Sequence, residues 1–227
     1  MPASKRFQGF LFDLDGTLID SVHDVHLCLN SVLGEHGREE LSLAVVTSLV
    51  GGGAQIMTHR ALEMTGGVQS RNQVRDVAEE FLCLYRKNPV RLSKIFPGGT
   101  NLLESLQSEN VQLAICTNKP RLTTDPVLAY FNLDKYFSLV RCGDEVPHQK
   151  PDRRHITDMM AEMGLKTRDV VMVGDSHNDI CAAHGAKVRS IAVTYGYDKS
   201  IATLPEVDLV ANSIAEVKDR LGEVWFA

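Results

Sequence analysis

Short apolar runs rich in valine and isoleucine alternate along this chain with segments of helical spacing. The runs cover residues 9–14, 111–116, 139–142, 170–173, 190–193 and 207–210. Apolar residues recur at helical spacing in residues 100–108, 122–131, 155–163 and 180–186. Because strands that alternate with helices pair in parallel and are covered on both faces, the pattern predicts an α/β fold with a doubly wound parallel sheet. Ligands of such sheets bind beyond the carboxyl ends of the strands.

Residues 21–92 interrupt this alternation, because they show helical patterning and no segment typical of a strand. We interpret them as a small α-helical cap inserted after the first strand. The α/β core then comprises residues 1–20 and 93–227. The Phe-Pro-Gly-Gly run at 96–99 is typical of a turn or hinge. A cap of this kind could close over a site and exclude water, although a rigid helical subdomain would show the same pattern.

Composition excludes several classes of function. Of the 227 residues, 23% are charged and 44% hydrophobic, as in an ordinary soluble globular protein. The formal charge of -5 gives no basic field to attract nucleic acid or an anionic membrane, and no apolar run approaches the ~20 residues of a membrane span. The five cysteines include no Cys-x-x-Cys pair, so we expect reduced thiols and a cytoplasmic protein. The pattern leaves monomer and homodimer open.

A pair of acids, Asp13 and Asp15, follows the first apolar run in the sequence FLFDLDGTL. If the strand continues through them, its period of two places both carboxylates on one side of the strand end. Like charges held close raise each other's pKa, so a bound cation or a shared proton is expected. The arrangement suits a nucleophile beside a general acid. The alternative is a strand followed by an ordinary Asp-Gly turn.

Further polar residues follow later strands or lie in loops between them. Thr117 and Asn118 can both donate hydrogen bonds to phosphate oxygens, although such a pair also caps helices or forms turns. Lys150 lies in a polar loop, where a lysine is usually solvated. Asp175 and Asp179 stand at a predicted helix start, where acids also interact favourably with the helix dipole.

The order of these residues is more informative than any one of them: an acid pair, a hydroxyl, a lysine and a second acid pair. In this order the chain resembles the haloacid dehalogenase superfamily of phosphohydrolases, and the resemblance covers essentially the whole chain. The matching motifs are the run DLDGT at 13–17, Thr117, Lys150, and the run from Gly174 to Asp179.

The resemblance implies a division of chemical roles. Asp13 would attack phosphorus and form an aspartyl-phosphate, and Asp15 would protonate the leaving oxygen and then activate water. Thr117, Asn118 and Lys150 would hold phosphate oxygens.

The resemblance also implies a Mg²⁺ cofactor. The ion would be held by Asp13, the main-chain carbonyl oxygen of Asp15, Asp175 and, directly or through water, Asp179. Because acids alone would repel a phosphate, the metal and Lys150 have to reverse the local charge balance.

Within the superfamily the chain is most similar to the phosphoglycolate phosphatases. The supporting features are Thr17 and the runs GGGA at 51–54, TNKP at 117–120 and VTYGY at 193–197. This likeness implies hydrolysis of a small phosphate monoester, 2-phosphoglycolate, to glycolate and phosphate. The alternatives are a phosphatase or phosphomutase for another small sugar phosphate, and a noncatalytic phosphate-sensing protein. The presence of both Asp13 and Asp15 argues against a noncatalytic phosphate-sensing protein, because binding alone does not need both acids.

Substrate-binding residues are expected at the first motif and in the cap. Gly16 and Thr17 would bring main-chain amides to the phosphate. A carboxylate on the substrate needs a cation or amide donors, which Arg60, Gly52 and Gly53 could supply. The structural alternatives are a solvated helix arginine and glycines that merely cap a helix.

Overall fold

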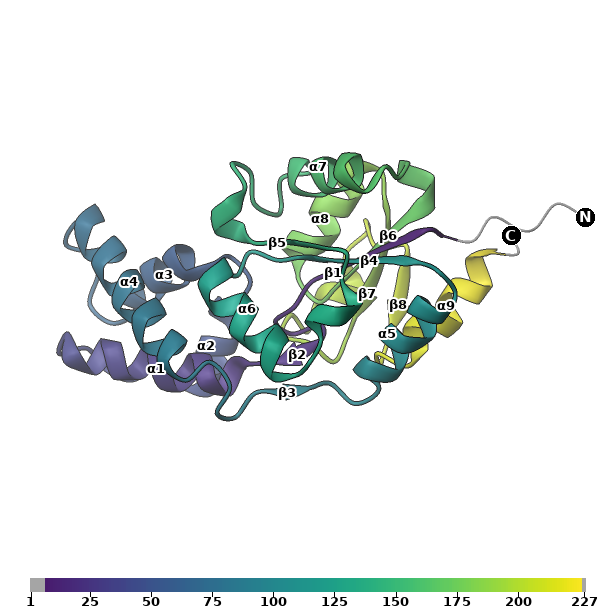
Figure 1. Cartoon of the computed structure of the whole chain (residues 1–227). Helices are drawn as coiled ribbons and strands as arrows, with labels where there is room; N and C mark the ends of the chain where they lie inside the picture. The colour runs from purple at the N-terminus through teal and green to yellow at the C-terminus, as the bar shows by residue number, and fades with distance from the viewer. Residues whose placement is uncertain (1–6, 226–227) are drawn as a thin grey trace, which may run out of the picture.

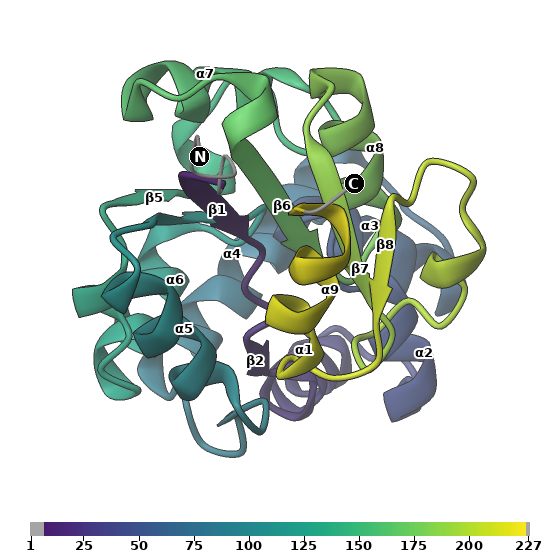
Figure 2. The same cartoon turned by 90° about the vertical axis from the view of Figure 1, so that its right-hand side faces the viewer.

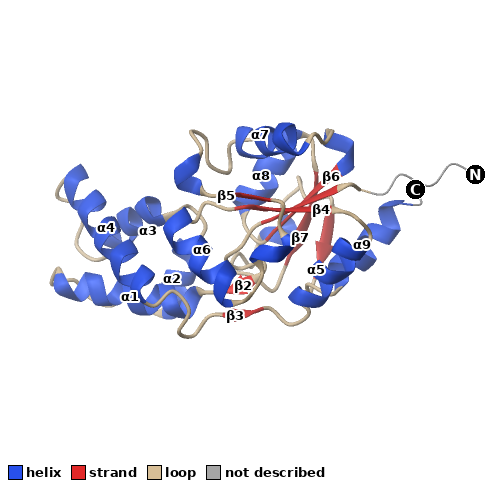
Figure 3. Ribbon diagram, viewed as in Figure 1, coloured by secondary structure: helices blue, strands red, loops and turns tan. Residues whose placement is uncertain are grey.

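The computed structural model describes residues 7–225. The predicted core therefore includes residues 1–6 and 226–227, which lie outside the described residues. Figure 1 shows a sheet flanked by helices at one end of the molecule and a separate group of helices, α1 to α4 (residues 22–87), at the other. Figure 3 shows that the strands are gathered in the first part, apart from one short ribbon between the two.

Six parallel strands form the main sheet, in the order β5-β4-β1-β6-β7-β8. They are β1 (Gly9–Phe12), β4 (Gln112–Cys116), β5 (Leu139–Arg141), β6 (Val170–Gly174), β7 (Arg189–Val193) and β8 (Leu209–Ala211). At the centre, Phe12 of β1 aligns with Ile115 of β4 and Val173 of β6. The predicted doubly wound α/β fold is confirmed, with small shifts at the strand ends.

Helices cover both faces of the sheet, as Figure 2 shows from the end opposite the four-helix group. Strand alternation turns Phe10 and Phe12 to one face and Leu11 to the other. The first face packs against α5 (Gly99–Ser108), α6 (Arg121–Tyr130) and α9 (Glu216–Trp225). The second packs against α7 (Arg154–Met163) and α8 (His177–Ala186). Single-turn 3₁₀ helices in the connections are η1 (Asp134–Tyr136), η2 (Gly143–Glu145), η3 (Thr167–Asp169) and η4 (Ile201–Thr203).

Four helices follow β1 and form what we call the cap: α1 (Val22–Glu35), α2 (Leu43–Leu49), α3 (Ala54–Met64) and α4 (Arg71–Lys87). They bury an apolar cluster of their own, which includes Leu29, Leu33, Leu62 and Tyr85. The helical patterning predicted for residues 21–92 is confirmed, while the division of the chain into core and cap domains stays a prediction. No helix within residues 7–225 has the length and hydrophobicity needed to cross a membrane.

A short antiparallel ribbon joins the cap to the rest of the molecule, and sequence analysis did not predict it. It pairs β2 (Ile19–Asp20) with β3 (Lys94–Ile95), so the chain enters and leaves the cap side by side. Strands of two residues are too short to show a period. The turn predicted at 96–99 is confirmed, since the Gly99 amide donates to the Phe96 carbonyl and Gly98 adopts a left-handed conformation.

Asp24 fastens the outgoing chain to the start of α1. Its buried carboxylate accepts hydrogen bonds from the main-chain amides of Arg91, Leu92 and Ser93, and from the Ser93 hydroxyl. The acid also lies in the first turn of α1, where negative charge interacts favourably with the helix dipole. One side chain thus links both connections of the cap.

We predict that Asp24→Ala lowers the free energy of unfolding by about 2 kcal/mol, because buried amides lose their acceptor. Urea unfolding followed by circular dichroism measures the change. The matched control is Asp76→Ala on α4, whose carboxylate is half exposed and should contribute less than about 0.5 kcal/mol. Equal losses in the two variants would contradict the assigned role of Asp24.

Candidate active site

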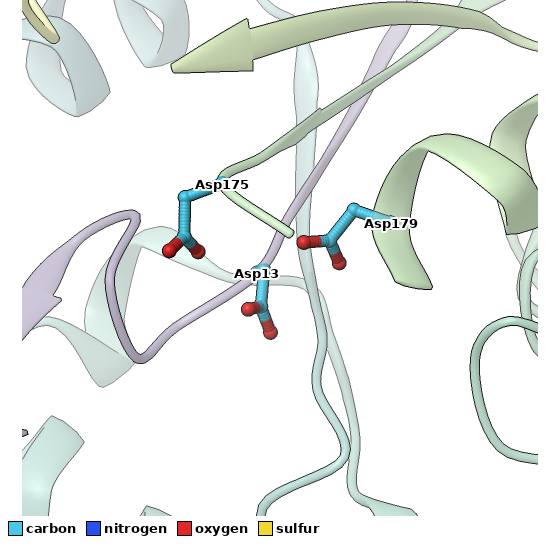
Figure 4. A group of neighbouring side chains, drawn as sticks. All are labelled: Asp13, Asp175 and Asp179. Atoms are coloured by element: carbon cyan, nitrogen blue, oxygen red, sulfur yellow. The ribbon is translucent and has the colours of Figure 1, made fainter. Parts of the chain in front are cut away.

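Three buried carboxyl groups meet beyond the ends of two central strands. Asp13 follows β1, Asp175 follows β6, and Asp179 stands in the first turn of α8 (Figure 4). One oxygen of each lies within 4.8 Å of the others. We call these three residues the acid cluster. Carboxylate oxygens are the ligands that Mg²⁺ prefers, so the donor set fits a divalent cation.

Local structure explains why the acid cluster forms. Because β1 and β6 pair in parallel, their carboxyl ends coincide, and the Asp13 amide continues the ladder by donating to the Val173 carbonyl at 3.0 Å. Ser176 caps α8, and its amide donates to Asp179 Oδ2 at 3.0 Å in a capping box. Strand pairing places the first acid, and helix capping places the last.

Burial and mutual repulsion raise the pKa of two members of the acid cluster, Asp13 and Asp175. For Asp13, burial raises the pKa to about 6, Lys150 opposes the rise, and Asp179 and Asp15 add to it. For Asp175, burial raises the pKa well above its ordinary value, and Asp13 and Asp179 raise it further. A cation bound here would relieve the repulsion among the charged forms.

Lys150 is buried against the acid cluster, although its loop position gave no sign of this. Its ammonium Nζ lies 2.9 Å from Asp13 Oδ1 and 2.6 Å from Asp179 Oδ1, and it also donates to the Cys116 carbonyl. Burial alone would lower the pKa of Lys150, but Asp13 and Asp179 raise it above its ordinary value. The side chain is therefore a fixed positive charge beside the candidate nucleophile.

Asn118 connects the Lys150 loop to the cap. Its amide group donates to the carbonyls of Gly51 and Lys150, each at 2.9 Å, and its oxygen accepts from the Lys150 amide at 3.1 Å. Both amide hydrogens are thus already donated within the protein, so in this structure Asn118 holds the main chain at Gly51 and Lys150 in place. Thr117 is also buried, and its hydroxyl oxygen accepts from the Lys119 amide at 3.2 Å.

Gly16 and Thr17 lie against the Asp175 carboxyl group in this structure. The Thr17 hydroxyl donates to Asp175 Oδ1 at 3.1 Å, and the Gly16 amide donates to the Ile19 carbonyl at 2.8 Å. Gly16 has φ of +87°, and a Cβ there would lie 2.2 Å from Asp175 Oδ2. Gly196, which sequence analysis did not single out, crowds the same acid: a Cβ there would lie 2.2 Å from Asp175 Cβ. The expected substrate contacts of Gly16 and Thr17 stay predictions.

Asp15 has its own lysine. β1 ends at Phe12, so strand alternation does not reach Asp15 and cannot fix its direction. Its carboxylate instead pairs with Lys119 and accepts from the Ser21 hydroxyl. Sequence analysis assigned no role to Lys119 or Ser21. The only signal for Lys119 was its place within the TNKP run at 117–120, which resembles the family.

A cavity between the strand ends and the cap is lined by both acids of the first motif, Asp13 and Asp15. Its polar wall is formed by Asp13, Asp15, Thr117, Asn118 and Lys119. Its cap wall is largely apolar and includes Val25, Val50, Met57, Phe81 and Leu82. Of the predicted cap residues, Gly53 lines the cavity, whereas Gly52 and Arg60 are not among the lining residues, and Arg60 is exposed on α3. Binding roles for these three stay predictions.

Comparisons with known proteins agree with this geometry. A family model of haloacid dehalogenase-like hydrolases matches residues 10–193. The chain is 35% identical to phosphoglycolate phosphatase of Agrobacterium fabrum over 94% of this chain and 91% of the relative. It is 37% identical to phosphoglycolate phosphatase of Haemophilus influenzae over 87% and 90%. The crystal structure of a predicted phosphoglycolate phosphatase from Haemophilus somnus has a TM-score of 0.89 at 30% identity, covering 94% of this chain and 97% of that one.

The chain belongs to the haloacid dehalogenase-like hydrolase family, as the order of its motifs predicted. Within that family its relatives identify it as a phosphoric monoester hydrolase.

We predict that Gly16→Ala displaces Asp175, because the added Cβ meets that carboxyl and the left-handed φ strains any L side chain. Phosphatase activity should fall by about 100-fold or more, with a loss of about 1–2 kcal/mol in the free energy of unfolding. Steady-state kinetics and urea unfolding measure the two effects. The matched control is Gly34→Ala on α1, where a Cβ meets nothing within 4 Å. Normal activity in Gly16→Ala would show that Asp175 tolerates displacement.

Proposed function

We propose that this protein is a Mg²⁺-dependent phosphatase that hydrolyses 2-phosphoglycolate to glycolate and phosphate through an aspartyl-phosphate. The observation that carries the proposal is the acid cluster, together with the hydrogen bond from the Lys150 ammonium to the Asp13 carboxylate. The relatives named phosphoglycolate phosphatase support the choice of substrate. A cytoplasmic location is part of the proposal. It is supported by the five cysteines, which are free thiols, because a reducing compartment keeps thiols unpaired.

The residues present fit a Mg²⁺ ion. Asp13, Asp175 and Asp179 would hold it through carboxylate oxygens, and the Asp15 carbonyl oxygen is a further proposed ligand. When bound, the ion supplies positive charge to the nonbridging phosphate oxygens. Lys150 contributes a second positive charge from the protein itself.

The proposed chemistry has two steps. In the first, a carboxylate oxygen of Asp13 attacks phosphorus, the ester bond breaks, and Asp15 gives its proton to the departing oxygen. In the second, Asp15 takes a proton from a water molecule, whose oxygen attacks phosphorus and releases phosphate from Asp13. Both acids line the same cavity, which allows one phosphate group to meet both.

A panel of phosphoesters separates this proposal from its alternatives. We expect phosphate release from 2-phosphoglycolate at the highest kcat/KM. Preference for hexose phosphates would favour a sugar-phosphate phosphatase, and transfer of the phosphoryl group back to the product would favour a phosphomutase. No release from any ester would favour a noncatalytic phosphate-sensing protein.

We predict that Asp13→Asn abolishes phosphate release, with a loss on the order of 10³-fold or more, because the amide cannot attack phosphorus. Release of inorganic phosphate from 2-phosphoglycolate measures the loss. The thermal unfolding temperature should not fall, since the change removes a buried like charge. Substantial residual turnover by the folded variant would refute the aspartyl-phosphate route.

We predict that Mg²⁺ stabilises the protein by about 2–3 kcal/mol at roughly 100 times its Kd, and that the effect depends on pH. Asp13 must lose its proton to bind the ion, and its pKa in the folded protein is raised to about 6. The stabilisation is therefore lost as the pH falls through that pKa, and the raised pKa of Asp175 adds to the loss. Thermal unfolding with Mg²⁺ and with a chelator, between about pH 5 and about pH 8, measures the difference. Asp175→Asn should lose the effect at every pH, and an undiminished effect at low pH would contradict the ligand set.

A further inference from the structure

We propose that Lys119 and Tyr85 are positioning residues that fix the Asp15 carboxylate and make its placement depend on cap helix α4. The inference rests on the proposed phosphatase function. It adds two residues that carry no chemistry themselves and decide where the proton carrier lies.

Lys119 donates hydrogen bonds to both Asp15 and Tyr85. Its Nζ lies 3.0 Å from each carboxylate oxygen of Asp15 and 3.1 Å from the Tyr85 hydroxyl oxygen. Two of the ammonium hydrogens therefore suffice to hold the lysine between the Asp15 carboxylate and the Tyr85 hydroxyl. Its side chain is only 7% exposed, so the ion pair with Asp15 lies largely inside the protein at the edge of the cavity.

The lysine remains charged despite its burial. Burial alone would lower the pKa of Lys119, but Asp15 and Tyr85 raise it above its ordinary value. The ammonium also lies 4.5 Å from the centre of the Tyr85 ring, a favourable cation–π distance. Two different contacts with one tyrosine therefore tie this cation to the cap.

Tyr85 is packed into the interior of the cap. It is 1% exposed, belongs to the apolar cluster of the cap helices, and stacks on Phe81 with ring centroids 5.7 Å apart. Lys119 belongs instead to the loop that follows β4. Any movement of α4 away from the strand ends would withdraw the tyrosine from Lys119 and leave Asp15 with a less constrained partner.

Asp15 is held on its other side by the start of α1. The Ser21 hydroxyl donates to Asp15 Oδ1, and the Ser21 amide donates to the Tyr197 hydroxyl oxygen at 2.7 Å. The carboxylate thus lies between the entry of the cap and a lysine held by its last helix. A buried ion pair is weak support for stability in general, but proton transfer to a leaving oxygen requires the Asp15 carboxyl group, in its protonated form, at a fixed position.

The chemistry of the leaving group provides a direct test. An alkoxide leaves with difficulty unless a proton reaches it, whereas p-nitrophenolate leaves without one because its charge spreads over the ring. Because kcat/KM reports only the steps up to departure of the leaving group, misplacing Asp15 should lower it for alkyl phosphates and spare p-nitrophenyl phosphate.

The experiment compares Lys119→Met and Tyr85→Phe on three substrates: 2-phosphoglycolate, 2-hydroxyethyl phosphate and p-nitrophenyl phosphate. We expect Lys119→Met to lose about 100-fold in kcat/KM on both alkyl phosphates and less than about fivefold on p-nitrophenyl phosphate. Tyr85→Phe, which keeps the packed ring, should lose about five- to tenfold on the alkyl phosphates alone. Lys87→Met and Tyr130→Phe are the matched controls, since Lys87 is exposed and Tyr130 is 68% exposed.

A stopped-flow readout follows the second step. With p-nitrophenyl phosphate, Lys119→Met should release a burst of p-nitrophenolate followed by slow turnover, because Asp15 must still activate water. If Lys119→Met does not fold, Tyr85→Phe carries the same substrate comparison.

Three results would overturn the inference. Equal losses on all three substrates would make the pair merely structural. Loss on 2-phosphoglycolate with 2-hydroxyethyl phosphate spared would make Lys119 a binding site for the substrate carboxylate. Full activity in both variants would show that Asp15 needs neither. Assays of the wild-type enzyme test the proposed function separately. If the wild-type enzyme hydrolyses 2-hydroxyethyl phosphate but not 2-phosphoglycolate, only the substrate assignment is wrong. If it hydrolyses none of the three esters, both the proposed function and this inference are wrong.

Discussion

Three buried carboxyl groups at the meeting point of β1, β6 and α8 impose the constraint on which the rest of the structure depends. Acids within 4.8 Å of one another, shielded from water, cannot all be charged without compensation. Lys150 supplies part of it from hydrogen-bond distance, and the donor set fits a cation for the rest. The packing is equally restricted, because a Cβ at any of three nearby glycines would lie within 2.3 Å of a cluster acid. These glycines are Gly16, Gly174 and Gly196.

The two acids of the first motif are served by different parts of the molecule. Asp13 pairs with Lys150 at the strand ends, so its place depends on the sheet. Asp15 pairs with Lys119, which is tied to Tyr85 in the cap. The proposed nucleophile and the proposed proton carrier are only two residues apart, yet one is fixed by strand pairing and the other by contact between domains that we predict to be separate. This division would let the sheet hold the phosphate site ready while the cap governs proton transfer.

The sequence was most informative where chemistry coincides with a strand end. Asp13 and Asp175 could be placed together because parallel strands bring their carboxyl ends to one edge, and Asp179 followed from its place at a helix start. The exposure of Arg60 could not be predicted, because helical spacing alone does not say which face of α3 meets the cavity. The β2–β3 ribbon escaped notice because two-residue strands have no period.

The sequence by itself determined the alternation of strands and helices, the inserted helical segment, the order of the motif residues and hence the family. Those features depend on local periodicity and on residue type, both of which can be read along one chain. Only the tertiary structure decided which partner each charged group meets. Asn118 proved to hold the Lys150 loop, and Lys119 proved to join Asp15 to Tyr85, which lie 104 and 34 positions away from the lysine along the chain. Such contacts depend on distance and burial in space, and no spacing along the sequence encodes them.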